Sequence, residues 1–312
     1  IPTNKKEAAI YYKMSADKGE VNAMFNYALN CYNGDGIPVN KKEAAIYFKK
    51  AVDKGHVGAM NNYAHMLDEG DGIPTNKRNA AIYYKKVADK GNESAMYNYA
   101  LMNDNGDGIP TNKKEAAIYY KMSADKGKVR AMMSYAHMCY KGDGIPVNKK
   151  EAAIYFKKAA DKGNEIAMYN YALMSNKGNG IPVNKKEAVH YYKILIEKGN
   201  DDAMFDYAVM LDNGDGIEKN KKEAAKYFKI LGEKGNQTAM FNYAIMLENG
   251  EGIESNKKEA FRLYKKLADE GFAVAMFKCG LFLFNGDVIT KDNNQAIRYF
   301  KMAADNGFSI GM

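Results

Sequence analysis

Residues 103–108 ("NDNGDG") place Asn, Asp and Gly at the spacing that opens a calcium-binding EF-hand loop. Such a loop needs oxygen ligands at its first, third, fifth and twelfth positions, and glycine at its sixth position allows the sharp turn. With Asp107 as the fifth residue and Gly108 as the sixth, the twelfth is Lys114, a cation where a bidentate carboxylate is required. The related stretches of the chain also lack a complete ligand set, so we do not expect a calcium site.

Other residues that could bind a metal or take part in catalysis also lack the neighbouring groups that such a site needs. Although His65 and His137 share an equivalent position, neither has a carboxylate or cysteine at metal-ligand spacing. Ser15 and Ser123 fill a core position, without the base and orienting acid that a nucleophile needs. The G-x-G turns lack the Lys-Ser/Thr of a phosphate-binding loop. We therefore predict a protein that is not an enzyme, with no cofactor and no metal.

The turn itself belongs to a unit that repeats every 36 residues without insertion or deletion. The isoleucines that mark it are Ile1, Ile37, Ile73, Ile109, Ile145, Ile181, Ile217, Ile253 and Ile289. A strict period of this length indicates stacked supersecondary units, which override the two or three globular domains that length alone suggests. The predicted fold is all-α: one α/α solenoid over residues 1–312, a right-handed superhelix of about nine 36-residue helix-turn-helix repeats.

The first helix of each unit is predicted from residues 4–19 ("NKKEAAIYYKMSADKG"). The segment begins with an N-cap Asn, carries Glu three positions later as in a capping box, and ends in glycine. Ala8, Tyr11, Tyr12 and Ser15 follow the spacing of an amphipathic helix, which turns Lys6, Ile10 and Lys13 outward. This helix therefore buries one face against the rest of the stack.

The second helix is predicted from residues 22–32 ("NAMFNYALNCY") and stops at a glycine. Met24, Tyr27, Ala28 and Cys31 lie on one face, with Ala23 beside them, so this face is expected to pack against neighbouring helices. The stretch that imitates calcium chemistry is the turn between units, where paired glycines permit left-handed backbone.

Residues 23–55 resemble the Sel1-like (Sel-one-like) repeat, a helix-pair module related to tetratricopeptide repeats. The pattern of that family is matched at Ala23, at Tyr27-Ala28, at Gly34 and Gly36, and at Ile37. Further matches follow at Asn40, Glu43-Ala44, Tyr47 and Ala51-Val52, and the resemblance extends over the whole chain. Tyr-Ala replaces the Leu-Gly of the family and Tyr its usual Trp, which indicates a repacked but equivalent core. The resemblance implies a solenoid that binds other proteins.

Composition and cysteines bear on the compartment. Mean hydropathy is −0.53 and no apolar run reaches the length of a membrane span. Cys31 and Cys139 are three units apart and Cys279 lies four units further, so none can form a disulfide within one solenoid. We expect free thiols and a cytoplasmic protein, although Ile1 begins within a turn and the chain is expected to be part of a longer one. The paired cysteines of bacterial relatives reported to bind or hydrolyse β-lactams are lacking, which leaves a hydrolase only as a remote alternative.

Lysines repeat at the outward position of Lys13. They are Lys13, Lys49, Lys85, Lys121, Lys157, Lys193, Lys229, Lys265 and Lys301. With a net charge of +8, this ladder offers an alternative function, the docking of a basic ridge on an acidic polymer or cytoskeletal lattice. Against it, acidic residues four positions on, such as Asp17, screen each lysine, and lysine favours exposed helix. We do not expect nucleic acid, because arginine is rare.

The second helix offers a more specific site on the face opposite its core stripe. One position there is nearly always Asn, and an asparagine ladder can hold the backbone of an extended peptide, because each amide both donates and accepts. Equally, these amides can bond to the backbone of the neighbouring unit. In the eighth unit this face becomes apolar, which predicts either cover by a following segment or an aromatic contact for a partner or a second copy.

We accordingly predict a non-catalytic scaffold or adaptor that holds protein partners in the concave groove of the solenoid. The predicted partner-binding residues are Phe25, Asn26, Leu29, Asn62, Tyr97, Asn98, Tyr169, Asn170, Phe205, Phe241, Asn242, Val274, Phe277, Leu281 and Phe284.

Overall fold

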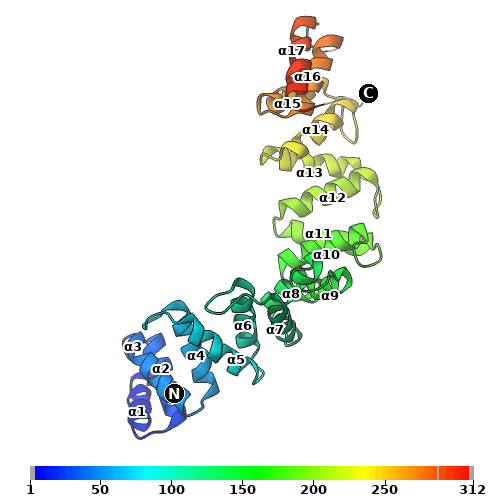
Figure 1. Ribbon diagram of the computed structural model, residues 1–312. Coiled ribbons are helices and arrows are strands. Elements are labelled where there is room, and N and C mark those ends of the chain that lie inside the picture. Colours follow the sequence, from blue (N-terminus) through cyan, green and yellow to red (C-terminus); the bar gives the residue numbers. More distant parts are fainter. Residues whose placement is uncertain (1–3, 287, 309–312) are drawn as a thin grey trace. The chain divides into compact units, whose positions relative to one another are not determined.

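The computed structural model of the chain describes residues 4–286 and 288–308, in which helices connected by short turns follow one another in chain order (Figure 1). The helices are α1 (Lys5–Asp17), α2 (Val21–Asn33), α3 (Lys41–Asp53), α4 (Val57–Glu69), α5 (Lys77–Ala88), α6 (Glu93–Asn105), α7 (Lys113–Asp125), α8 (Val129–Lys141), α9 (Lys149–Asp161), α10 (Glu165–Lys177), α11 (Lys185–Glu197), α12 (Asp201–Asn213), α13 (Lys221–Glu233), α14 (Gln237–Asn249), α15 (Lys257–Asp269), α16 (Ala273–Asn285) and α17 (Asn293–Asp305). The described residues contain 17 helices and no strand, which confirms the all-α repeat fold. The chain divides into two compact units, residues 1–167 and residues 168–312.

The odd-numbered helices begin as predicted. The Asn4 side chain accepts a hydrogen bond from the Glu7 amide and donates one to the Glu7 carboxylate at 3.1 Å. The same cap recurs where Asn40 precedes α3 and Asn112 precedes α7. Each even-numbered helix whose end the structure describes stops at a left-handed glycine such as Gly34, with φ of 78°. Helix length is therefore set by local residues at both ends.

The core runs through each unit between successive helices. In α3, the positions predicted to be buried are buried, and Ala45 and Val52 are buried beside them. These residues are Ala44, Ala45, Tyr47, Phe48, Ala51 and Val52. The stripe is wider than predicted because α3 packs against α2 on one side and α4 on the other. In α1, which packs chiefly on α2, Tyr11 and Tyr12 remain exposed.

Tyrosine hydroxyls join neighbouring repeats across this core. Tyr27 donates to Glu43 at 2.9 Å and Tyr47 donates to Asp17 at 2.6 Å, while the two rings meet edge to face at 4.7 Å between centroids. Each such hydrogen bond contributes about 0.5–1.5 kcal/mol to stability. Burial of the ring and the bond to Glu43 raise the pKa of Tyr27 well above its usual range. The tyrosines that depart from the family pattern thus add polar links to the packing that they supply.

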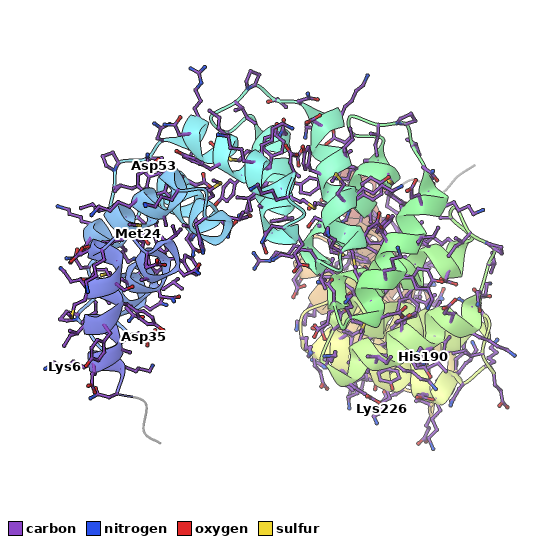
Figure 2. The ribbon with its side chains drawn as sticks, turned by 90° about the horizontal axis from the view of Figure 1, so that it is seen from below. Lys6, Met24, Asp35, Asp53, His190 and Lys226 are labelled. Atoms are coloured by element: carbon purple, nitrogen blue, oxygen red, sulfur yellow. The ribbon has the colours of Figure 1, made fainter. Side chains whose placement is uncertain are left out.

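The turn that resembles a calcium loop is used for packing between repeats. Asp35 lies in the turn after α2 (Figure 2). Its carboxylate forms an ion pair with Lys5 at 2.7 Å, and Asp71 pairs with Lys41 at the same distance. A side chain at Gly36 would come within 2.2 Å of the Lys5 carbonyl oxygen, so this close approach requires glycine. The recurring Asp-Gly therefore holds the turn after an even-numbered helix on the first turn of the odd-numbered helix that precedes it.

Candidate functional site

The predicted partner-binding residues lie on the side of the even-numbered helices that is not fully covered. Phe284 is exposed and the others are half-buried, whereas the core residues beside them, such as Tyr27 and Ala28, are buried. The half-buried side chains come from α2, α4, α6, α10, α12, α14 and α16, where the 3.6-residue period brings residues three or four apart to one face. Each compact unit therefore presents its own row of these side chains.

Aromatic rings in this row pack at the junctions between repeats. The Phe25 ring lies 4.5 Å from the His56 ring and 6.0 Å from the Phe48 ring, both in the next repeat. Phe241 makes the equivalent contacts with Tyr264 and Phe272 at 5.5 Å. One face of each ring thus supports the stack, which makes these positions poorer candidates for a partner than their sequence variation indicated.

The asparagines in the row differ in their contacts. The amides of Asn26, Asn62 and Asn242 form no hydrogen bond with another residue that the structure describes, whereas Asn98 lies beside the hydroxyl of Tyr84. Where Asp206 replaces Asn, it accepts from Tyr169 at 3.0 Å. Burial raises the pKa of Asp206. Within the described residues, the amides of Asn26, Asn62 and Asn242 therefore do not make the bond to the backbone of the neighbouring unit that one of the two interpretations predicts.

A hollow in residues 1–167 brings two of the predicted residues together. Leu29 on α2 and Asn62 on α4 stand at its sides, and Phe48 of α3, which is 1% exposed, forms part of its lining. The full lining is Leu29, Tyr32, Asn33, Phe48, Asn62 and His65. The Tyr32 hydroxyl is already engaged by Asp71 at 2.8 Å, so the Tyr32 ring supplies apolar surface while Asn62 and His65 supply polar groups. The site can accommodate an aliphatic group next to an amide.

Four of these lining residues were not among the predicted site residues. Tyr32, Asn33 and His65 occupy outward positions of α2 and α4, but Phe48 comes from the intervening α3, which sequence periodicity assigns to the core. One sequence signal was present: the position of Leu29 holds His at residues 65 and 137, where an aliphatic residue stands in the other repeats. That alternation marks a position whose side chain the core does not determine.

The apolar face of α16 is only partly covered. The Phe277 ring lies 5.4 Å from the Phe300 ring of α17 and 5.0 Å from Phe308, so a following helix packs on it. Phe284 is 50% exposed, with the ammonium group of Lys291 5.1 Å from its ring centroid. Phe277 is therefore covered by the segment that follows, as one explanation predicts, whereas Phe284 remains half exposed.

The lysine ladder is largely paired with carboxylates. Lys13 binds Glu43 at 3.1 Å and Lys121 binds Glu151 at 2.5 Å, each across to the next odd-numbered helix. The hydrogen bond from Lys121 lowers the pKa of Glu151 and outweighs the opposite effect of burial. Other lysines of the ladder meet the acidic residue four positions on, as Lys157 does with Asp161 at 3.6 Å. The lysines of the ladder are thus neutralised both by acidic residues of their own helix, as expected, and by glutamates of the next odd-numbered helix.

The three cysteines are free and buried in the core. Burial raises the pKa of Cys279 to about 12, which removes thiolate character. Within the described residues there is no cluster of three or more His, Cys, Asp or Glu side chains placed to hold a metal ion. None of the described helices combines the length and apolar character needed to cross a bilayer.

Comparison with known proteins identifies the repeat. The profile of the Sel1 repeat matches residues 1–20, 21–56, 57–92, 93–128, 129–164, 166–200, 201–236, 237–272 and 273–308. No curated protein matches the chain.

Two solved structures share the fold. One is a protective antigen present in uropathogenic Escherichia coli strains that displays an SLR fold, with 24% identity and a TM-score of 0.73 over 96% of this chain. This chain spans 64% of the length of that antigen. The other is a Sel1 repeat protein from Oxalobacter formigenes, with 25% identity and a TM-score of 0.55, covering 78% of this chain and 96% of the other.

Proposed function

Because the chain belongs to the Sel1 repeat family, we propose that it is a non-catalytic scaffold that holds a polypeptide segment on the open face of its even-numbered helices. Solenoids of this family commonly serve as protein-interaction scaffolds. The observation that carries the proposal for this chain is the hollow between α2 and α4, where Leu29 and Asn62 converge.

The hollow has the features of a peptide site. An aliphatic wall and an aromatic lining accept a side chain, and the open Asn62 amide offers a donor and an acceptor to a peptide backbone. Asn26 repeats this amide one repeat earlier, so an extended segment can meet two successive open amides within residues 1–167, and Asn242 offers an equivalent amide within residues 168–312. Predicted residues such as Phe284 then add separate apolar contacts.

The alternatives have less support. A basic ridge that docks on an acidic polymer needs unpaired ammonium groups, whereas Lys13, Lys85 and Lys121 of the ladder are paired with carboxylates. The β-lactam chemistry of cysteine-rich relatives has no counterpart in the three buried, free thiols. We therefore propose protein binding as the function. We expect a cytoplasmic location, because free thiols are typical of a reducing compartment.

Panning of a library of short random peptides against the full chain tests this function. We expect selected peptides to bind, and Asn62→Ala combined with His65→Ser to weaken them about tenfold or more, because each lost polar contact costs roughly 1 kcal/mol. Asn294→Ala, at an exposed position of α17, is the matched control and should leave binding unchanged.

Two results would contradict the proposed function: failure to select any peptide, or selected peptides whose affinity is insensitive to the Asn62 and His65 variant. Raising the salt concentration separates the groove from a charged ridge, because a groove contact changes little while ridge docking weakens steeply. Thermal melting of each variant confirms that the fold is intact.

A further inference from the structure

Isoleucine occupies the same outward position of every odd-numbered helix in residues 1–167. This isoleucine row consists of Ile10, Ile46, Ile82, Ile118 and Ile154, which are 50%, 55%, 46%, 54% and 46% exposed. Single exposed apolar residues are common on protein surfaces and need no explanation. Five of them at the same position of consecutive odd-numbered helices form a regular row of apolar side chains, and apolar residues gathered on one surface are typical of an interaction site.

Helix stability does not account for these isoleucines. Residues 168–312 hold His190, Lys226, Arg262 and Arg298 at the same position, and each lies in a complete helix. Figure 2 labels His190 on α11 and Lys226 on α13. Isoleucine is a poorer helix former than lysine or arginine, because its branched side chain loses freedom against the preceding turn. The fold therefore accepts charge at this position, and the isoleucines carry a cost in helix propensity.

A row of unpaired cations borders the isoleucines one helical turn away. Its members, all exposed, are Lys6, Lys42, Arg78, Lys114 and Lys150. None of them forms an ion pair with another residue in the part of the chain that the structure describes, unlike the lysine ladder. At Ile154 the surface is also hollowed, and its lining includes Lys150, Glu151 and Lys158. Glu151 is already paired with Lys121 and Lys158 with Asp125, so the Lys150 ammonium is the charged group of this lining without an ion pair among the described residues. The charge complementary to this row of unpaired cations is negative.

We propose that the isoleucine row and its cationic border bind an acidic helical segment of another protein, which lies across the odd-numbered helices. Consecutive odd-numbered helices touch through pairs such as Tyr47 with Asp17, so the isoleucines recur at about one helix diameter, roughly 10 Å. A partner helix rises about 10.5 Å in seven residues. An aliphatic residue in each heptad of the partner thus meets one isoleucine per repeat, and its acidic residues meet the cations.

A narrow ligand fits this face better than an anionic membrane. The far end of the same face carries exposed carboxylates at Asp17, Asp53, Asp89, Asp125 and Asp161. A planar anionic surface would lie against these carboxylates as well as the cations and be repelled by them. A helix that runs along the isoleucine row meets the cations on one side and stays clear of the aspartates, which lie seven residues, about 10 Å, further along. This surface is independent of the proposed groove.

The probe is a synthetic helical peptide of about 28 residues, four heptads long, with leucine once per heptad and glutamate beside it. Fluorescence anisotropy with the full chain should show binding that weakens as salt rises. Ile46→Ser, Ile82→Ser and Ile118→Ser together should lower the affinity about tenfold or more. The groove variant of Asn62 and His65 should bind the probe normally, which separates this proposal from the groove.

A matched charge control is available within the chain. Lys42→Ser, Arg78→Ser and Lys114→Ser remove three positive charges at the border, and Lys186→Ser, Lys222→Ser and Lys258→Ser remove three at the same position of residues 168–312. Only the first set should weaken the probe and reduce its salt dependence. The proposal is overturned if the probe fails to bind, if both charge sets act alike, or if phosphatidylserine vesicles bind through the isoleucines while the peptide does not.

Discussion

The two compact units of the molecule have the same residues at equivalent core positions and different residues at an equivalent outward position. Ala131 and Ala239 fill the same fully buried position in residues 1–167 and 168–312, and Met132 and Met240 follow them in the core. At the outward position, Ile118 of the first unit corresponds to Lys226 of the second. Packing fixes the first pair because a neighbouring helix meets it, whereas no helix constrains the second. The repeat thus separates positions that determine the fold from positions free to serve a partner.

Polar links between repeats also differ. Tyr155 donates across repeats to Asp125 at 2.6 Å, as Tyr47 and Tyr119 do to their own aspartates. In the second unit the equivalent Tyr227 donates to Glu223 of its own helix at 3.4 Å. In the first unit, tyrosine hydroxyls therefore join consecutive odd-numbered helices. At Tyr227 of the second unit, the hydroxyl instead bonds within its own helix.

The largest expected effect is common to both units. A side chain at Gly108 would approach the Lys77 carbonyl carbon to 2.5 Å, and one at Gly252 would approach that of Lys221 to 2.4 Å. Gly108→Ala and Gly252→Ala should each cost about 2–5 kcal/mol, because left-handed backbone strain adds to overpacking. Denaturant unfolding measures both. The control is Gly163→Ala, where the backbone is also left-handed but nothing lies within 4 Å, and the cost should be only the strain.

A buried alanine gives the next largest effect. Ala131→Leu and Ala239→Leu should each destabilise the protein by about 1–3 kcal/mol, because both side chains are fully buried and the added atoms overpack the helix contact. Urea unfolding of the two variants gives the comparison. Similar losses support the shared interior, whereas a silent substitution in one unit would show that its helices do not approach closely there.

These shared features were predictable from sequence because they are local. The period, the caps at Asn4 and Gly34, and the apolar faces of both helices depend on residues within one unit. The pairing of Asp35 with Lys5 and of Tyr47 with Asp17 was not predictable, since each joins residues thirty apart in the sequence that helical periodicity does not relate. The sequence pattern predicts the turn that contains the aspartate but does not identify the lysine that pairs with it.

The candidate site was predictable only in part. Helical periodicity placed Leu29 and Asn62 on the open face, but the hollow also needs Phe48 from a helix assigned to the core. The aromatic position of Phe25 looked free because it varies, yet its ring supports the next repeat. Ile10 was expected to face outward, but the significance of its row emerges only when its exposure and the unpaired cations beside it are known.

Tyrosine substitutions should separate the two units. Tyr155→Phe should lower the unfolding free energy by about 0.5–1.5 kcal/mol, because it removes the hydroxyl that donates a hydrogen bond to Asp125 and links two repeats. Tyr227→Phe should cost less, since its 3.4 Å bond lies within one helix and joins no repeats. Thermal melting of the paired variants compares them, and equal losses would remove this distinction between the units.

Two carboxylates should give opposite responses to pH. The pKa of Glu151 is lowered, first by the hydrogen bond from Lys121, so its stabilising contribution is present above its unfolded pKa and is lost as pH falls through its folded pKa. The pKa of Asp206 is raised by burial, so its contribution is present below its unfolded pKa and is lost as pH rises through its folded pKa.

Glu151→Gln should therefore flatten the loss of stability in acid, whereas Asp206→Asn should flatten a loss between acid and neutral pH. Both effects are expected to be smaller than that of Tyr155→Phe, because the two carboxyl groups keep contact with solvent. Unfolding free energies measured across the acid range supply the check. A change of the same sign in both variants would contradict the assigned pKa directions.

The smallest effects should come from exchanging the outward residues that distinguish the units. Ile118→Lys and Lys226→Ile should each change the unfolding free energy by no more than about 0.5 kcal/mol, with the lysine slightly favoured at both sites for its helix propensity. Urea unfolding under identical conditions measures the pair. A loss above about 1 kcal/mol for Ile118→Lys would show that Ile118 belongs to the core, because a half-exposed side chain with no structural role loses little on replacement. Near-neutral exchange would instead leave partner binding as the property in which the two outer faces differ.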